Sequence, residues 1–174
     1  SEVGLEVSGV EGEGWVADVL ARLTGDTTLS MVRKPRGFRG RLRPYQRRGL
    51  SWLAFMGECG LGACLADDMG LGKTIQVISL LLHDRSASGD GAGREPNLIV
   101  CPTSLVENWR GELKRFAPSL DVWVHHGPNR LKGHALVRAV AESDVVITTY
   151  GVAGRDMKGL GKVRAARALG GLPR

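Results

Sequence analysis

The sequence predicts an α/β domain built on a parallel sheet with crossover helices. Apolar runs of strand length, such as residues 98–101 and 144–150, alternate with segments whose apolar residues recur at helical spacing. A glycine-rich turn stands directly before one helical segment, at residues 74–82. The chain has 174 residues, 43% hydrophobic and 24% charged, so one domain can bury a sizeable core. This alternation is typical of parallel strands joined by helices.

Five segments are predicted to be helical. Pro44 suits the first turn of the helix that begins there. The segment 74–82 is mostly apolar, which indicates a buried helix. In the next helix, Leu105, Trp109 and Leu113 recur at helical spacing. The predicted helices cover residues 15–23, 44–56, 74–82, 104–116 and 135–141.

Four segments are predicted to be strands. Small residues at 61–67 indicate a short buried strand that leads into the glycine turn. The alternation in 120–125 is typical of an exposed edge strand, and the Gly-, Ser- and Asp-rich stretch 83–97 indicates a surface loop. The predicted strands cover residues 61–67, 98–101, 120–125 and 144–150.

Composition limits the class of protein. No apolar run is long enough to cross a membrane, and three cysteines at unrelated positions indicate neither a disulfide framework nor a zinc site. We therefore expect a cytoplasmic protein without a membrane partner. The net charge of +6 favours an anionic partner. His125 and His126 form no metal-binding pattern with the cysteines, and we assign them no role.

The glycine turn at residues 67–74 has the composition of a phosphate-binding loop. Gly70 and Gly72 can adopt backbone conformations that other residues avoid, so the loop N–H groups can face phosphate oxygens at the positive end of the next helix. Lys73 would bridge two phosphates, and the Thr74 hydroxyl would bind Mg²⁺. Asp67 stands where the general P-loop pattern has glycine. The alternative is a plain strand–helix turn with a solvated lysine, which the second glycine and the predicted helix disfavour.

Four segments in a fixed order resemble the Swi/Snf-type ATPases, which are DNA-dependent motors of the second helicase superfamily. They are LRPYQRRGLSWL (42–53), ACLADDMGLGKTIQVISLL (63–81), LIVCPTSLVENW (98–109) and VVITTYGV (145–152). The resemblance implies a RecA-like P-loop lobe, incomplete at its C-terminus, that binds ATP and Mg²⁺. The family's catalytic positions correspond here to Lys73 and Thr74, the latter being the metal ligand.

The resemblance also implies a set of nucleotide-binding residues. Gln46 matches the glutamine that recognises adenine in the family, and an amide suits that edge because it offers one donor and one acceptor. ATP rather than GTP follows from this match. The implied nucleotide-binding residues are Gln46, Asp67, Asp68, Met69, Gly70, Leu71, Gly72, Lys73 and Thr74.

Two motifs resemble segments that lie along duplex DNA in the family. One follows a predicted strand and the other ends one, at the carboxyl edge where ligands bind in open α/β sheets. The implied contacts to the DNA backbone come from Thr103, Ser104, Thr148, Thr149 and Tyr150. Ser104 is alternatively a helix N-cap that forms a capping box with Glu107. Trp109 is expected in the core rather than stacked on a base.

A run of basic residues at 33–48 has three possible interpretations. It can lie near DNA, lie near ATP, or form a solvated face, which is the usual fate of charge runs. Its members are Arg33, Lys34, Arg36, Arg39, Arg41, Arg43, Arg47 and Arg48.

The resemblance also implies parts that this chain lacks. The family's Asp-Glu pair should follow the TTY strand, and no acidic residue follows Asp156. The second lobe, with its arginine fingers, is also missing. We therefore expect residues 1–30 to be the end of an upstream region or a linker, residues 31–156 a partial ATP-binding lobe, and residues 157–174 an aberrant or disordered tail. A reading-frame shift near residues 157–164, or a broken gene, would explain that tail.

Three functions remain open at this point. The first is the ATP-binding half of a DNA translocase that binds ATP but hydrolyses it poorly, nucleoid-associated in a bacterium or nuclear in a eukaryote. The second is a non-catalytic nucleotide-binding module. The third, an ordinary P-loop kinase or GTPase, ranks last because it would not need Gln46 or the two DNA-related motifs.

Overall fold

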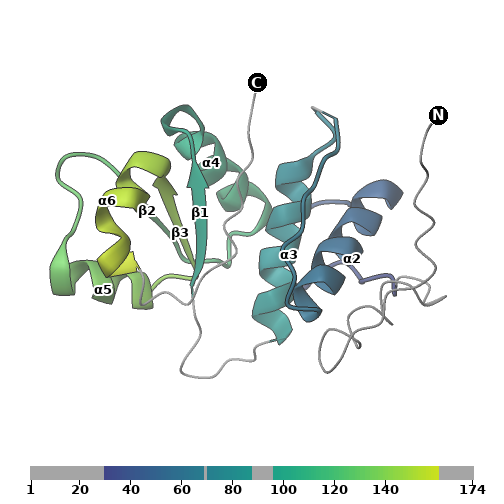
Figure 1. Ribbon diagram of the computed structural model, residues 1–174. Coiled ribbons are helices and arrows are strands. Elements are labelled where there is room, and N and C mark those ends of the chain that lie inside the picture. Colours follow the sequence, from purple (N-terminus) through teal and green to yellow (C-terminus); the bar gives the residue numbers. More distant parts are fainter. Residues whose placement is uncertain (1–29, 69, 88–95, 161–174) are drawn as a thin grey trace, which may run out of the picture.

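The computed structural model describes residues 30–68, 70–87 and 96–160. Helices surround a small central sheet (Figure 1). The elements are α2 (Pro44–Glu58), α3 (Lys73–Ala87), β1 (Asn97–Cys101), η1 (Thr103–Leu105), α4 (Val106–Phe116), β2 (Val122–His125), α5 (Gly133–Ala141), β3 (Val145–Thr149) and α6 (Tyr150–Leu160). Among the described residues, no helix combines the length and apolarity needed to cross a bilayer.

The described strands form one parallel sheet in the order β1-β3-β2. Ile147 of β3 is aligned with Ile99 of β1 on one side and with Val124 of β2 on the other. All five residues of β3 are buried, whereas three of the four residues of β2 are half-buried. This is the α/β architecture that the sequence predicts, with residues 120–125 providing an edge strand.

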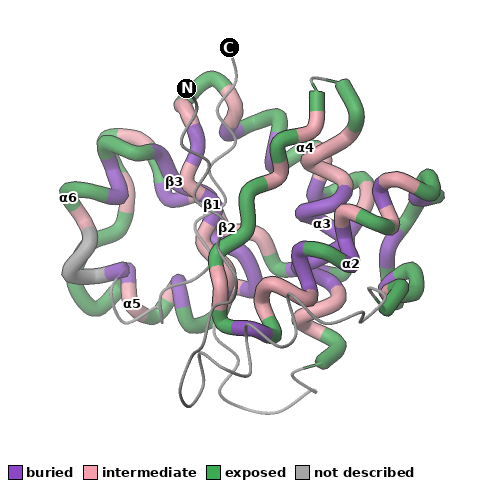
Figure 2. Tube along the Cα trace, turned by 45° about the vertical axis from the view of Figure 1, so that its right-hand side comes forward, coloured by how far each residue is buried: buried purple, intermediate pink, exposed green. Residues whose placement is uncertain are grey.

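Alternate residues of the strands face two different helical layers. Ile99, Cys101 and Ile147 belong to a large core that includes residues of α2, α3 and α4. Val146 belongs to a smaller core with Leu136 and Val140 of α5 and Leu160 of α6. The buried segments therefore concentrate along the sheet and α3, between the two helical layers (Figure 2).

An ion pair sets the direction of α3 relative to the sheet. Arg85, near the end of α3, lies 2.7 Å from the carboxylate of Asp144, which directly precedes β3. The same guanidinium donates to the carbonyl of Ser119. The C-terminal end of α3 is thus held at the amino edge of the sheet. Its N-terminal end, with the glycine loop, therefore lies toward the carboxyl edge (Figure 1).

Most predicted elements are confirmed. The predicted helices at 44–56, 74–82 and 135–141 correspond to α2, α3 and α5, and the predicted strands at 98–101, 120–125 and 144–150 correspond to β1, β2 and β3. Helix α3 runs on to Ala87, into the predicted loop at 83–97, and Arg85 and Ser86 form hydrogen bonds there that favour the longer helix. The predicted helix at 15–23 lies outside the described residues.

The predicted strand at 61–67 is wrong. Residues 61–68 have no regular secondary structure, and Gly62, Ala63 and Cys64 are exposed. A strand needs a neighbour for its N–H and C=O groups, and this segment pairs with none of the three described strands. Its small side chains also bring little apolar surface to a core.

The predicted N-cap at Ser104 is also wrong. The Leu105 N–H donates to the Pro102 carbonyl over 2.9 Å and closes a 3₁₀ turn that contains Ser104. The α-helix therefore starts only at Val106, and its cap residue, Leu105, makes no side-chain hydrogen bond. The capping box with Glu107 does not form because Ser104 lies inside the preceding turn.

Helices α2 and α3 pack tightly at Gly49. A Cβ atom added at Gly49 would lie 1.7 Å from Oε1 of Gln76. Gln76 is fully buried, so its amide cannot swing into solvent. Only glycine fits at this crossing without a shift of the glutamine.

We predict that Gly49→Ala lowers the free energy of unfolding by about 1–3 kcal/mol, as overpacked cores do. Gly111→Ala is the matched control, because a Cβ there meets no atom within 4 Å. Gly111 lies inside α4, so alanine should stabilise it by up to about 1 kcal/mol. Urea denaturation of both variants measures the difference. Equal effects of the two substitutions would contradict the close helix contact.

Candidate functional site

The glycine loop adopts, at two positions, backbone conformations that most residues avoid. Gly70 and Gly72 have φ values of 82° and 79°, in the left-handed region that favours glycine. A Cβ at Gly72 would also lie 2.6 Å from Nε2 of Gln46. Helix α3, with 15 residues, begins at the next residue. The loop therefore lies at the positive end of a long helix.

Lys73 lies folded against its own loop. Its ammonium group donates to the carbonyl oxygens of Asp67 and Asp68, over 2.5 and 3.0 Å. The carboxylate of Asp67 accepts a 2.8 Å hydrogen bond from Nε2 of Gln76. Thr74 is half-buried in the first turn of α3. Met69 of the predicted nucleotide site lies outside the described residues.

Gln46 reaches the loop from α2. Its Nε2 donates to the carbonyl of Leu71 over 3.1 Å, and the Tyr45 hydroxyl donates to the same oxygen over 3.1 Å. Its Oε1 accepts the N–H of Arg43 over 2.9 Å. Gln46 is only 5% exposed. The structure thus brings together Gln46 and the glycine loop, which the family resemblance had connected.

Part of the basic run lies beside Gln46. An open pocket of about 690 Å³ is lined by Met31, Arg41, Leu42, Arg43, Pro44, Arg47 and Arg48. The Nε atom of Arg47 is buried and has no hydrogen-bond partner among the described residues. The arginines therefore gather at the start of α2, on the same helix as Gln46.

The DNA-related motifs leave the same edge of the sheet. Cys101 of β1 pairs with Thr149 of β3, so η1 and Tyr150 emerge side by side. Thr103 and Ser104 are exposed, and Tyr150 is 49% exposed.

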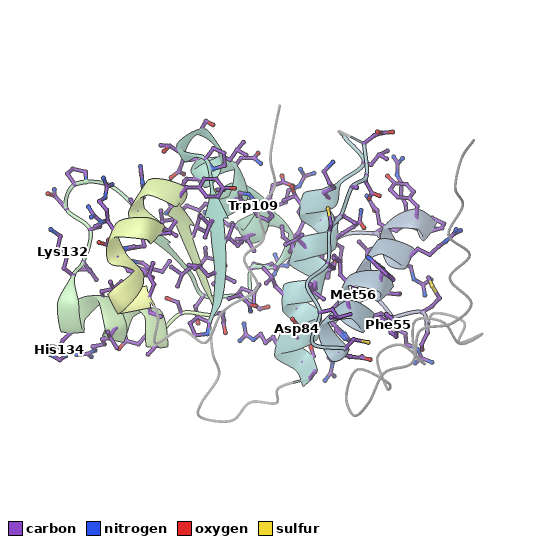
Figure 3. The ribbon with its side chains drawn as sticks, viewed as in Figure 1. Phe55, Met56, Asp84, Trp109, Lys132 and His134 are labelled. Atoms are coloured by element: carbon purple, nitrogen blue, oxygen red, sulfur yellow. The ribbon has the colours of Figure 1, made fainter. Side chains whose placement is uncertain are left out.

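Thr148 and Thr149 are buried in the central strand. The Thr148 hydroxyl donates to the carbonyl of His125 over 2.8 Å and so ties β3 to β2. Trp109 is only 7% exposed and packs in the large core, which confirms the predicted core position. Figure 3 shows it on the inner side of α4.

A cluster of charged and polar groups at this edge was missed by the sequence analysis. The Oδ2 atom of Asp156, on α6, lies 2.9 Å from Nε2 of His125 and 2.6 Å from Nε of Arg130. The side chains of His125, Arg130 and Asp156 are 0%, 14% and 12% exposed. The hydrogen bond from Arg130 is the main cause that lowers the pKa of Asp156 to about 2. The three residues are far apart in the sequence, so no local spacing indicated the cluster.

We predict that Asp156 stabilises the fold at neutral pH and not in strong acid. Its pKa is about 2 in the folded chain, below the ordinary value of 3.8, so the folded state binds this proton less tightly than the unfolded state. Such stabilisation is fully present above the unfolded pKa and is lost as the pH falls through the folded pKa. Asp156→Asn should therefore cost about 1–2 kcal/mol near pH 7 and little near pH 2.

Urea denaturation across this pH range measures the effect. The control is Glu142→Gln, which breaks the exposed 2.9 Å pair with Arg138 and should cost little at any pH. A deficit of the Asp156 variant that stays constant down to pH 2 would argue against an ionised carboxylate as its cause.

Comparisons with known proteins agree with this geometry. Residues 45–169 match the SNF2-related domain. The chain is 45% identical over 145 residues to YwqA of Bacillus subtilis, which is named as an ATP-dependent helicase/translocase. This match covers 83% of the chain and 15% of YwqA. It is 39% identical over 124 residues to the ATP-dependent DNA helicase DDM1 of Arabidopsis thaliana. That match covers 68% of the chain and 16% of DDM1.

A solved structure gives the same result for the fold. The SWI2/SNF2 ATPase core of Sulfolobus solfataricus in complex with dsDNA superimposes with a TM-score of 0.62 at 39% identity. The match covers 74% of this chain and 25% of that structure, so the chain corresponds to a part of an ATPase core. With its glycine loop, its parallel sheet and these matches, the chain belongs to the SNF2-related family, as the sequence motifs predict.

Proposed function

We propose that this chain is the ATP-binding lobe of a DNA-dependent translocase and that its glycine loop binds the phosphates of Mg²⁺-ATP. The observation that carries the proposal is the loop itself. Two glycines with positive φ stand directly before a 15-residue helix, and Lys73 and Gln46 both contact the loop backbone. This arrangement fits a triphosphate, because N–H groups and an ammonium can converge on its oxygens.

The residues of the loop have distinct proposed roles. The loop N–H groups and Lys73 bind phosphate oxygens, and the Thr74 hydroxyl is a ligand of Mg²⁺, which would neutralise charge on the phosphates. The ammonium of Lys73 now rests on two loop carbonyls, so it is already inside the loop and needs only a change of side-chain rotamer to reach a phosphate. Asp67 is held by Gln76 and shapes the start of the loop.

Gln46 is the proposed adenine-recognition residue. Its amide uses one N–H on the Leu71 carbonyl and one lone pair on the Arg43 N–H. An amide has a second N–H and a second lone pair, and these remain for the base. Gln46 would thus connect the base to the loop that holds the phosphates.

Hydrolysis by this chain alone should be slow. Efficient turnover needs groups that position the attacking water and stabilise charge on the γ-phosphate. The last acidic residue of the sequence is Asp156, and its carboxylate is occupied by Arg130 and His125. This observation keeps a non-catalytic nucleotide-binding module as the second candidate. An ATPase assay with and without duplex DNA separates the two, since DNA stimulation favours the translocase.

Duplex DNA is the proposed partner of the carboxyl edge. Thr103, Ser104 and Tyr150 are exposed where β1 and β3 end, and hydroxyl and N–H groups suit phosphate oxygens, which carry no base sequence. The solved ATPase core of Sulfolobus solfataricus, similar to this chain, is described in complex with dsDNA. Thr148 and Thr149 would support this edge from inside the sheet.

We predict that Lys73→Ala abolishes saturable binding of a fluorescent ATP analogue in the presence of Mg²⁺. The loss should exceed tenfold in affinity, since about 1.4 kcal/mol already gives that factor and charge-assisted hydrogen bonds contribute more. Lys114→Ala, an exposed lysine in the last turn of α4, is the matched control and should bind normally. Absence of saturable binding by the folded wild-type chain would refute the proposal.

We predict that Ser104→Asp weakens binding of a labelled duplex by about three- to tenfold at low salt, because it places a negative charge against phosphates. Ser119→Asp makes the same change at an exposed position near the amino edge, beside Arg85. That variant should bind DNA as the wild type does. Fluorescence anisotropy measures both. Equal losses would indicate a general charge effect and would speak against a DNA site at the carboxyl edge.

A further inference from the structure

One carboxylate connects three parts of the carboxyl edge. Asp156 lies on α6, His125 ends β2, and Arg130 lies in the connection between β2 and α5. Besides the contacts of Oδ2, Oδ1 of Asp156 lies 3.3 Å from Nη2 of Arg130. Arg130 also donates from Nη1 to the carbonyl of Gly127 over 3.4 Å. The connection, residues 126–132, is therefore held to α6 and to its own backbone by one side chain.

His125 extends this network into the sheet. Its side chain is fully buried, and its Nδ1 has no partner among the described residues. The proton of a neutral ring therefore belongs on Nε2, which faces the Asp156 carboxylate. Its carbonyl accepts the hydroxyl of Thr148, so the network ends directly beside Thr149 and Tyr150. The carboxylate thus joins the 126–132 connection to α6 and, through His125, to β3.

The connection that Asp156 holds is basic on its outside. No acidic residue lies between Asp121 and Glu142 in the sequence. His126 and Lys132 are exposed, and so is His134 in the first turn of α5. Lys132 and His134 project outward on the side of the molecule away from α2 (Figure 3). The negative charge of Asp156 is enclosed and paired with Arg130, so it does not cancel this outer positive charge.

A buried ion pair is a poor source of net stability, because both charges lose their hydration. Its bonds are directional, however, and they fix the positions of the groups that they join. Apolar contacts in the same place would allow residues 126–132 to shift along α6. Compared with a hydrophobic contact, this network therefore adds a defined position of residues 126–132 relative to α6 rather than extra stability.

We propose that Asp156 is a positioning residue for DNA binding: it holds His125 and Arg130 so that residues 126–132 and the start of α6 present Lys132 and the Tyr150 backbone to one phosphate backbone. This inference rests on the proposed DNA contact of the carboxyl edge. It assigns no contact with DNA or nucleotide to Asp156 itself.

The test compares two variants that make the same change in net charge. Asp156→Asn and Glu142→Gln each remove one carboxylate that is paired with an arginine, the second from the exposed Arg138 pair at the end of α5. Simple electrostatics predicts that both variants bind a labelled duplex slightly more tightly. A positioning role predicts instead that Asp156→Asn lowers the affinity for the duplex by about three- to tenfold. Glu142→Gln should then bind the duplex at or above the wild-type affinity.

Two further measurements, the salt dependence of DNA affinity and the affinity for ATP, distinguish a positioning role from general destabilisation. The slope of log affinity against log salt should be smaller for Asp156→Asn, because fewer phosphates are contacted. Its affinity for a fluorescent ATP analogue should equal that of the wild type, because the glycine loop lies on other elements. A variant that merely unfolds in part would lose both affinities and keep the salt slope.

Arg130→Lys is the second variant, for use if Asp156→Asn does not fold. Lysine keeps the charge but not the planar fork that binds two carboxylate oxygens, so DNA affinity should again fall while ATP affinity stays. If the wild type binds DNA and both variants match Glu142→Gln, the positioning role is wrong. If the wild-type chain binds ATP but no DNA, the proposed DNA contact itself fails.

Discussion

The parallel pairing of β3 with both of its neighbours determines where function can lie in this chain. Because β1, β3 and β2 run in the same direction, the segments that follow them all leave at one edge. The ion pair between Arg85 and Asp144 anchors the far end of α3 at the opposite edge. The glycine loop at the start of α3 is thereby brought to the same end of the molecule as the DNA-related motifs. The proposed nucleotide site and the proposed DNA contacts therefore lie on connected elements.

The glycine loop keeps its shape without a strand in front of it. Four side chains do this: Gln46 and Tyr45 bind the Leu71 carbonyl, Lys73 binds the Asp67 and Asp68 carbonyls, and Gln76 binds the Asp67 carboxylate. The close contact of α2 with α3 at Gly49 brings these groups within reach. The loop thus depends on α2, so Gln46 on α2 and the glycine loop on α3 lie together, as the proposed nucleotide site requires.

Much of the fold could be predicted because helical and strand periodicities are local. The alternation in 120–125 and the continuous apolar run at 144–150 correctly indicated an edge strand and a buried strand. Predictions failed where the outcome depends on a partner that local sequence does not specify. Residues 61–67 have strand-like composition but pair with no strand in the described part of the chain. Ser104 is a residue type that favours an N-cap, but it lies in a turn closed by the Pro102 carbonyl.

The candidate site also contains residues that local sequence could indicate and residues that it could not. Gly70, Gly72 and Lys73 could be proposed from their spacing, because a phosphate-binding loop is a single continuous segment. The network of His125, Arg130 and Asp156 could not, because its members come from three elements that only the fold brings together. Each of those residues, taken alone, has an ordinary sequence context. Their burial, and the low pKa of Asp156, are properties of the assembled edge.

The two enclosed arginine–aspartate pairs have comparable roles at opposite edges of the sheet. Arg85 holds α3 to the start of β3, and Arg130 holds the β2–α5 connection to α6 beside the end of β3. Each aspartate also accepts a second donor, the Asp121 N–H in one case and His125 in the other. A hydrophobic contact could stabilise these junctions as well, but it would not fix their register. The proposed function requires a nucleotide and a DNA backbone to be held at a defined separation, and directional bonds at both ends of the central strand meet that requirement.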